Sequence, residues 1–280
     1  MIVGFRALVP TGGLAGWRLL DRTLDSQLAR AAASPAIARD VAYMEAHLPE
    51  TTTAQDLVDD PRLLRIVATA FGLESEVPKK AFLRKVLESD LGDPSSFANR
   101  LTDRRYRTMA VALGLSGASG EPSTADPALL KQIGGDYVVT RFESDVGEQN
   151  EPLRLALHFR RTIGAIANAA SADTSGWFAV MGQPPVREVL QTALGLPDGI
   201  GKLDIDRQKA LYEAASRKLL GSPSVRALAD PAKVDAVITR FVARAGLAEA
   251  APAAGGVALL LGGGSVGAAG IMSILAARAG

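Results

Sequence analysis

The sequence predicts an all-α fold, and three observations support this prediction. Apolar residues recur every three or four positions in most segments, which places them on one face of a helix. Proline, serine or aspartate precedes many of these segments and glycine follows several, as is typical of helix starts and ends. No segment shows the sustained alternation of apolar and polar residues that marks a half-buried strand. The sequence therefore predicts a helical array.

The composition of the 280 residues fits this fold and narrows the function. Hydrophobic residues make up 48% of the chain but aromatic residues only 5%, so leucine, alanine, valine and isoleucine must fill the core. A formal net charge of +1 argues against a dedicated nucleic-acid binder, which concentrates basic charge. The richest basic stretch, residues 202–244, also carries acidic residues, as a solvated helix face does. The absence of cysteine excludes disulfides and thiolate chemistry.

The first predicted segment covers residues 1–55. Its first 13 residues read as extended chain, because Pro10 and two glycines that follow it block a helix. From Leu14 the apolar spacing becomes helical, and Ser34-Pro35 ends this helix and begins another. The N-terminus does not resemble a cleaved secretory signal. We therefore expect the protein to stay in the cytoplasm or to leave it by a signal-independent route.

Four further predicted helices share a common start and a common end. Each begins at a capping residue or proline, and each ends at a glycine followed by leucine, a sequence that favours a left-handed helix terminus. They begin at Asp60-Pro61, Asp103, Pro184-Pro185 and Asp230-Pro231, and end at Gly72-Leu73, Gly114-Leu115, Gly195-Leu196 and Gly246-Leu247.

A second shared sequence lies between the first and second of these helices and again between the third and fourth. The sequence Leu-Gly-x-Pro-Ser occurs at Leu91 to Ser95 and again at Leu220 to Ser224, in the same order relative to the helix ends. We interpret this recurrence as an internal duplication, with repeat units at residues 56–117 and 180–248. Chance recurrence of Gly-Leu in an alanine- and leucine-rich chain is the alternative.

Residues 118–179 are predicted to connect the two units. A loop leads to Asp126-Pro127, which begins a long helix through Phe142. A turn is predicted at Val146-Gly147, and Glu151-Pro152 then begins a further helix.

The last segment, residues 249–280, is an apolar tail rich in glycine and alanine. It contains Gly262, Gly264 and Gly267 in the spacing of a dinucleotide-binding turn. That motif needs a βαβ unit, and too few residues follow Gly267 to supply the second strand, so we reject a nucleotide site. Residues 257–277 carry no charge and would span a bilayer if helical. The favoured alternative is a segment that orders on a partner or covers the protein's own core.

The residues that could support catalysis are few. The only histidines, His47 and His158, are far apart in sequence, which argues against a zinc site in a chain without cysteine. Three carboxylates, Glu143, Asp145 and Glu148, are close together, and we interpret them as a solvated helix end. We therefore predict no catalytic residue, no metal and no cofactor. The alternative is a hydrolase or another small-molecule enzyme that uses Glu143, His158 and a nucleophile.

Several segments of the first 160 residues match a known family pattern in the same order. They are the run from Gly13 to Thr23, Gln27, Ser34-Pro35, Arg39-Asp40-Val41-Ala42-Tyr43, residues 56–64, Ala70-Phe71-Gly72-Leu73, residues 98–106 and residues 137–161. Through these segments the chain resembles a family of helical domains of uncharacterised molecular function, which is common in alphaproteobacteria and is often encoded beside flagellar basal-body and rod genes. The apolar tail departs from this pattern.

This resemblance implies a non-enzymatic structural or assembly protein of the flagellum, such as an adaptor, a chaperone or a minor basal-body component. Its partners would be proteins, including flagellar components, and not nucleic acid. A tail-anchored membrane adaptor that uses residues 257–277 is a further alternative. We expect protein contacts at apolar residues near the two ends of the chain, namely Trp17, Leu20, Leu259, Leu261 and Ile271. For Trp17, packing into the protein's own core is the alternative.

Overall fold

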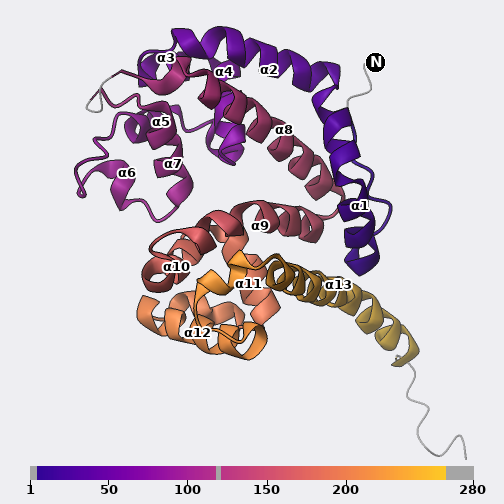
Figure 1. Ribbon diagram of the computed structural model, residues 1–280. Coiled ribbons are helices and arrows are strands. Elements are labelled where there is room, and N and C mark those ends of the chain that lie inside the picture. The colour runs from indigo at the N-terminus through magenta and orange to yellow at the C-terminus, as the bar shows by residue number, and fades with distance from the viewer. Residues whose placement is uncertain (1–4, 118–120, 263–280) are drawn as a thin grey trace, which may run out of the picture.

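The computed structural model describes residues 5–117 and 121–262, and the surroundings of side chains up to residue 247. Every regular element in these ranges is helical, which confirms the all-α prediction. Figure 1 shows two groups of helices, with α1 along one side. Helix α1 contacts α8 of the first group and α9 and α13 of the second, so it ties the two groups together.

The first group contains the helices up to α8. They are α1 (Gly13–Ala32), α2 (Pro35–His47), α3 (Ala54–Asp59), α4 (Pro61–Ala70), α5 (Lys80–Leu87), α6 (Phe97–Arg100), α7 (Arg104–Leu113) and α8 (Pro127–Gln149). Short 3₁₀ turns lie at Leu48–Glu50, Glu74–Glu76 and Ser123–Ala125. Helix α4 forms the centre of this group, because it packs against both α2 and α8 and nearly all of its apolar side chains are buried.

The second group is built around α9. Its helices are α9 (Glu151–Asn168), α10 (Ala172–Met181), α11 (Pro184–Leu194), α12 (Ile205–Leu220) and α13 (Pro231–Gly262), with 3₁₀ turns at Asp198–Lys202 and Val225–Ala229. Helix α9 buries residues on most of its circumference, including Leu155, Phe159 and Ile163. It packs against α10, α11 and α13 and so forms the centre of this group's core. It also packs against α8, which makes it the main contact with the first group.

Most of the predicted helix starts and ends are confirmed. Asp60 caps α4 by accepting hydrogen bonds from the backbone N–H groups of Arg62 and Leu63, both at 2.9 Å. Asp103, Asp126 and Asp230 cap their helices in the same way. Gly72, Gly114 and Gly195 take positive φ angles of 70°, 66° and 73° after the ends of α4, α7 and α11, as the Gly-Leu pattern predicts.

Two predicted interruptions of helices are wrong. Helix α13 does not end at Gly246 but continues to Gly262. Helix α8 passes through Val146-Gly147 and ends at Gln149, where Asn150 caps the next helix. Gly147 leaves space for the side chain of Arg154, which a Cβ atom would displace. A single glycine costs a helix only about 1 kcal/mol, so one glycine does not by itself end a helix.

The two Leu-Gly-x-Pro-Ser sequences have different structures. Gly221 ends α12 with a φ of 74°, whereas Gly92 lies in a turn that begins several residues after the end of α5. With Gly246 inside a helix as well, the two predicted units share only part of their local structure. The internal duplication stays a prediction.

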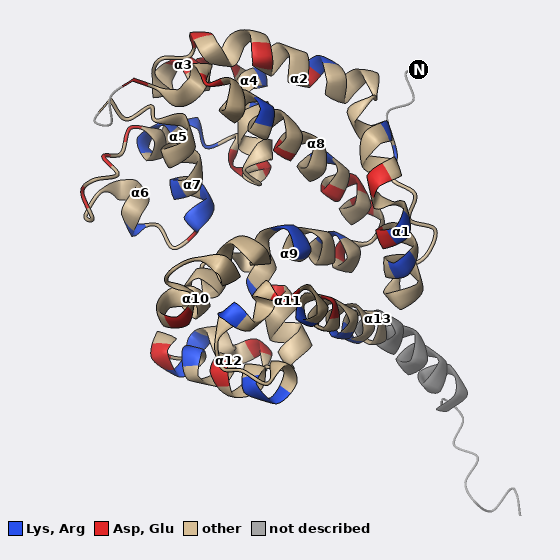
Figure 2. Cartoon of the chain, viewed as in Figure 1, with Lys and Arg blue, Asp and Glu red and all other residues tan. Residues whose placement is uncertain are grey.

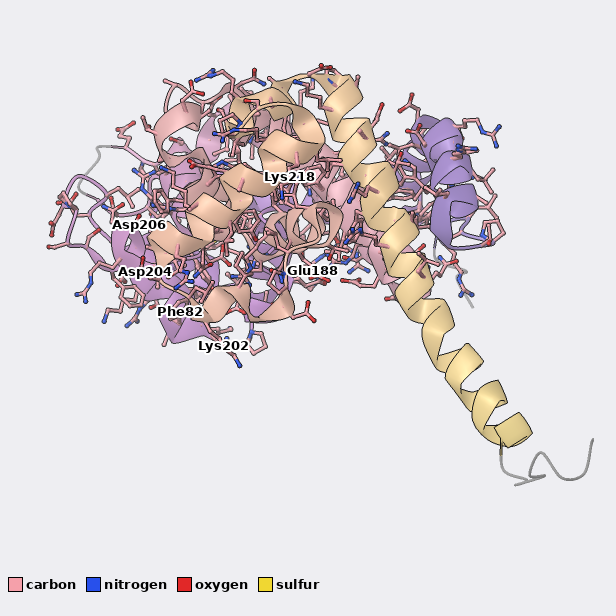
Figure 3. All side chains as sticks on the ribbon, turned by 90° about the horizontal axis from the view of Figure 1, so that it is seen from below. Phe82, Glu188, Lys202, Asp204, Asp206 and Lys218 are labelled. Atoms are coloured by element: carbon pink, nitrogen blue, oxygen red, sulfur yellow. The ribbon has the colours of Figure 1, made fainter. Side chains whose placement is uncertain are left out.

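The described part of the apolar tail extends α13, which projects from the body of the protein (Figure 3). Residues 263–280 lie outside the described residues, so most of the predicted 257–277 segment does too. Among the helices that are described, none has the length and apolar character needed to cross a bilayer.

Candidate functional site

A polar cleft lies where the two helical groups meet. It has a volume of about 250 Å³ and is open to solvent. Its walls come from the end of α4, from α7 and α8 in the first group, and from α9 and the start of α11 in the second. The polar side chains that line it are Arg104, Arg105, Thr108, Gln132, Asp136, His158, Arg161, Thr162 and Gln183. Figure 2 shows the acidic residues of α8 and the basic residues of α9 on neighbouring helices.

Glu143 of α8 lies beside this cleft and is almost fully buried, with 4% of its surface exposed. Both of its carboxylate oxygens accept hydrogen bonds from the guanidinium of Arg161, at 2.9 and 3.0 Å. The Nδ1 atom of His158 lies 3.5 Å from the same carboxylate. The prediction that Glu143 belongs to a solvated helix end is therefore wrong, because the carboxylate faces α9 and not the solvent.

The carboxylates around Arg161 have pKa values shifted in opposite directions. Burial alone would raise the pKa of Glu143, but hydrogen bonds from His158 and Arg161 outweigh burial and hold the pKa below its ordinary value. Asp136 is 3.9 Å from Arg161, and burial raises its pKa because this distant charge compensates only in part. Glu143 is thus the stable anion of the cluster.

Arg105 of α7 stabilises the wall of the cleft that the first group forms. Its guanidinium donates to the carboxylate of Asp103, with the closest contact at 2.7 Å, and also to the backbone carbonyl of Gly72. This contact joins the start of α7 to the end of α4. The neighbouring Arg104 is exposed and forms no ion pair within the described residues.

The cleft also brings a hydroxyl group close to His158. The Oγ1 atom of Thr162 lies 3.5 Å from His158 Nε2, one turn along α9. The order Thr162, His158, Glu143 thus has the connectivity of a nucleophile, a base and an orienting acid. Both links are at 3.5 Å, longer than the usual range for a catalytic hydrogen bond, and Arg161 already occupies both oxygens of Glu143. Within the described residues, no three His, Asp or Glu side chains are arranged to hold a metal ion.

The other candidate residues lie outside this cleft. Asp145 accepts a hydrogen bond from the backbone N–H of Ala7, and Glu148 is exposed. His47 stacks on Tyr43, with the ring centroids 3.9 Å apart. His47 and His158 do not come together.

The predicted contact residues fall into two sets. Trp17 and Leu20 are buried, with 6% and 1% of their surfaces exposed, and Arg160 lies over the indole ring of Trp17 at 5.0 Å from the centroid. Packing within the chain accounts for both side chains. Leu259 and Leu261 belong to α13, but their side chains are outside the described part, and Ile271 lies wholly outside it.

Sequence reasoning missed Arg161 and Asp136. A usable signal was nevertheless present, because Asp136 and Glu143 are seven residues apart on α8 while His158 and Arg161 are three apart on α9. Each spacing puts its two residues on one helix face. The missing information was that these two faces pack against each other.

Comparison with known proteins gives one family and one solved structure. Residues 70–234, more than half of the chain, match the family described as "protein of unknown function (DUF1217)". The fold is similar to the X-ray crystal structure of protein AGR_C_984 from Agrobacterium tumefaciens, with a TM-score of 0.68 and 26% sequence identity. This similarity covers 85% of the present chain and 96% of the Agrobacterium chain. No curated protein matches the sequence.

Proposed function

We propose, on the premise that the chain belongs to the DUF1217 family, that it is a non-enzymatic structural or assembly protein of the flagellum. It would act as an adaptor, a chaperone or a minor basal-body component. The observation that carries the non-enzymatic part is the Glu143–Arg161 pair. The buried carboxylate of Glu143, beside the cleft, has both oxygens bonded to Arg161 and so joins α8 to α9, which is a structural role.

The flagellar part of the proposal rests on the sequence resemblance. The segments from Gly13 to Arg161 resemble a family that is often encoded beside flagellar basal-body and rod genes. A helical protein that presents surfaces to other proteins suits that setting.

Deletion of the gene tests this role. We expect the deletion strain to swim poorly and a plasmid copy to restore swimming. Normal swimming with normal filaments would contradict the proposal.

The location of a tagged copy then distinguishes an exported component from a chaperone, a cytoplasmic adaptor and a membrane adaptor. Recovery from the flagellar or extracellular fraction only when the flagellar export apparatus is intact would identify an exported component. Cytoplasmic retention in both strains would identify a chaperone or cytoplasmic adaptor. Membrane association that resists carbonate extraction would favour the tail-anchored alternative.

A second candidate function, a hydrolase, is favoured by the contact between Thr162 and His158. It predicts hydrolysis of p-nitrophenyl acetate that is lost in both Thr162→Ala and His158→Ala. We expect a rate equal to that of the buffer for the wild type. Turnover that depends on both residues would replace the structural proposal with the enzymatic one.

A further inference from the structure

A groove on the second helical group is separate from the polar cleft. Helices α12 and α13 both pack against α11 but hardly touch each other, and the groove runs between them beside the C-terminal end of α11. Its volume is about 370 Å³. The apolar part of its lining is formed by four half-buried leucines, Leu194, Leu196, Leu211 and Leu219.

Cationic side chains stand on both sides of these leucines. Lys218 comes from the last turn of α12 and Arg240 from α13, and both are exposed. Neither forms an ion pair or a hydrogen bond with another residue in the described ranges. Figure 3 shows Lys218 on α12, next to α13.

The end of α11 would normally bring negative potential into this groove, because a helix C-terminus exposes carbonyl groups. Here Arg244 of α13 donates a long hydrogen bond of 3.4 Å to the carbonyl of Thr192, and its guanidinium lies close to Gly195. The cation offsets that potential. The groove is therefore apolar along its floor and positive at its rim.

From this arrangement we infer that the groove binds an acidic amphipathic helix of a partner protein. An apolar floor between two helices accepts the apolar face of a third helix. Acidic residues flanking that face would meet Lys218 on one side and Arg240 on the other, and such charge complementarity selects the partner and its orientation. Nucleic acid fits less well, because the floor is made of leucine and not of cations. This inference rests on the proposed function, since it supplies the kind of protein that an adaptor would hold.

A designed peptide tests the groove without knowledge of the natural partner. The probe is a fluorescein-labelled helical peptide with leucines at spacings of three and four residues and glutamates on both flanks. Its counterpart has lysine in place of every glutamate. Fluorescence anisotropy with the full chain measures both affinities.

We expect the wild type to bind the glutamate peptide at least about tenfold more tightly than the lysine peptide. The double variant Lys218→Glu/Arg240→Glu should reverse this preference, which a loss of folding could not do. The control Lys80→Glu/Lys131→Glu changes net charge equally, at two exposed lysines of the first group that form no ion pair within the described part of the chain, and should bind like the wild type.

Three outcomes would overturn the inference. They are no binding of the glutamate peptide, equal effects of the groove and control variants, and binding of anionic phosphatidylglycerol vesicles without binding of either peptide. The deletion strain tests the flagellar role independently. A motility defect together with a failed peptide test would support the proposed function and refute only the inference about the groove.

Discussion

The two helical groups use their charged residues differently. In the first group, Asp40 of α2 accepts hydrogen bonds from Arg62 and Arg65 of α4, at 2.9 and 2.8 Å, and from the hydroxyl of Tyr137 of α8, at 2.6 Å. Arg62 and Arg65 thus join α4 to α2. In the second group, the ion pairs of the described residues are few, and apolar packing around α9 dominates.

The cations that the second group does not use internally remain on its surface. Lys218 and Arg240 are examples, and they border the leucine-lined groove. We therefore assign internal cohesion to the paired charges of the first group and partner binding to the cations that border the groove of the second.

The largest effect is expected at the pair that joins the groups. Arg161→Ala would leave the buried carboxylate of Glu143 without its main partner, and we expect a loss of about 3 kcal/mol in the free energy of unfolding. Urea denaturation followed by circular dichroism measures this loss. Arg100→Ala, at an exposed arginine without an ion pair in the described residues, should stay within about 0.5 kcal/mol of the wild type. Equal effects of the two variants would mean that the pair does not hold α8 to α9.

Two buried tyrosines give a matched comparison between the groups. The hydroxyl of Tyr137 donates to Asp40 and accepts from Arg65, whereas the hydroxyl of Tyr212 has no hydrogen-bond partner among the described residues. Tyr212 stacks on Trp177, and burial raises its pKa to about 12.

We expect Tyr137→Phe to lose about 1–3 kcal/mol of stability and Tyr212→Phe to lose none or to gain up to about 1 kcal/mol. The same urea experiment measures both. A loss at Tyr212 as large as that at Tyr137 would show that the second group also depends on buried polar contacts.

We expect acid to lower the stability of the protein in part by protonating Asp40 of the first group. Burial would raise the pKa of Asp40, but hydrogen bonds from Tyr137, Arg65 and Arg62 lower it below its ordinary value. An unfolded chain then binds this proton more readily than the folded protein, so stability falls as the pH falls from about 4 through the lowered pKa. We expect Asp40→Asn to be less stable than the wild type at pH 7 and to lose less stability between pH 5 and pH 3. An unchanged pH dependence in the variant would exclude Asp40 as a source of acid sensitivity.

The smallest effects concern two glycines of the second group. Gly195 has a φ of 73° and lies against Arg244, so Gly195→Ala should cost about 1 kcal/mol or more. Gly246 lies inside α13, where a Cβ atom would meet, among the described residues, only Gly13 Cα, at 3.8 Å. Gly246→Ala should therefore gain about 0.5–1 kcal/mol, measured as a higher melting temperature. A loss at Gly246 would indicate that the helix ends there, as the sequence pattern predicts.

The local features of this fold were predictable from sequence because they depend on neighbouring residues. Asp60 caps α4 through N–H groups two and three residues away, and Gly114 ends α7 through its own backbone. The predictions at Gly147 and Gly246 are wrong because a single glycine weakens a helix by only about 1 kcal/mol and does not by itself end it.

The candidate site was less predictable for the same reason. Glu143 and His158 were recognised as chemically capable residues, but the sequence did not indicate that α8 and α9 face each other or that Arg161 neutralises Glu143. The groove was missed altogether, because its leucines come from the end of α11, the loop after it and α12. Only the packing of α12 and α13 on either side of α11 reveals that Lys218 and Arg240 flank the same apolar surface.

Swimming of a strain that carries Lys218→Glu/Arg240→Glu in place of the wild-type gene shows whether the second group binds its partner through the cations that border the groove. We expect this strain to swim as poorly as the deletion strain, at normal protein level, while a strain with Lys80→Glu/Lys131→Glu swims normally. Normal swimming of the groove variant, or an equal defect in the control, would mean that these cations do not bind the partner.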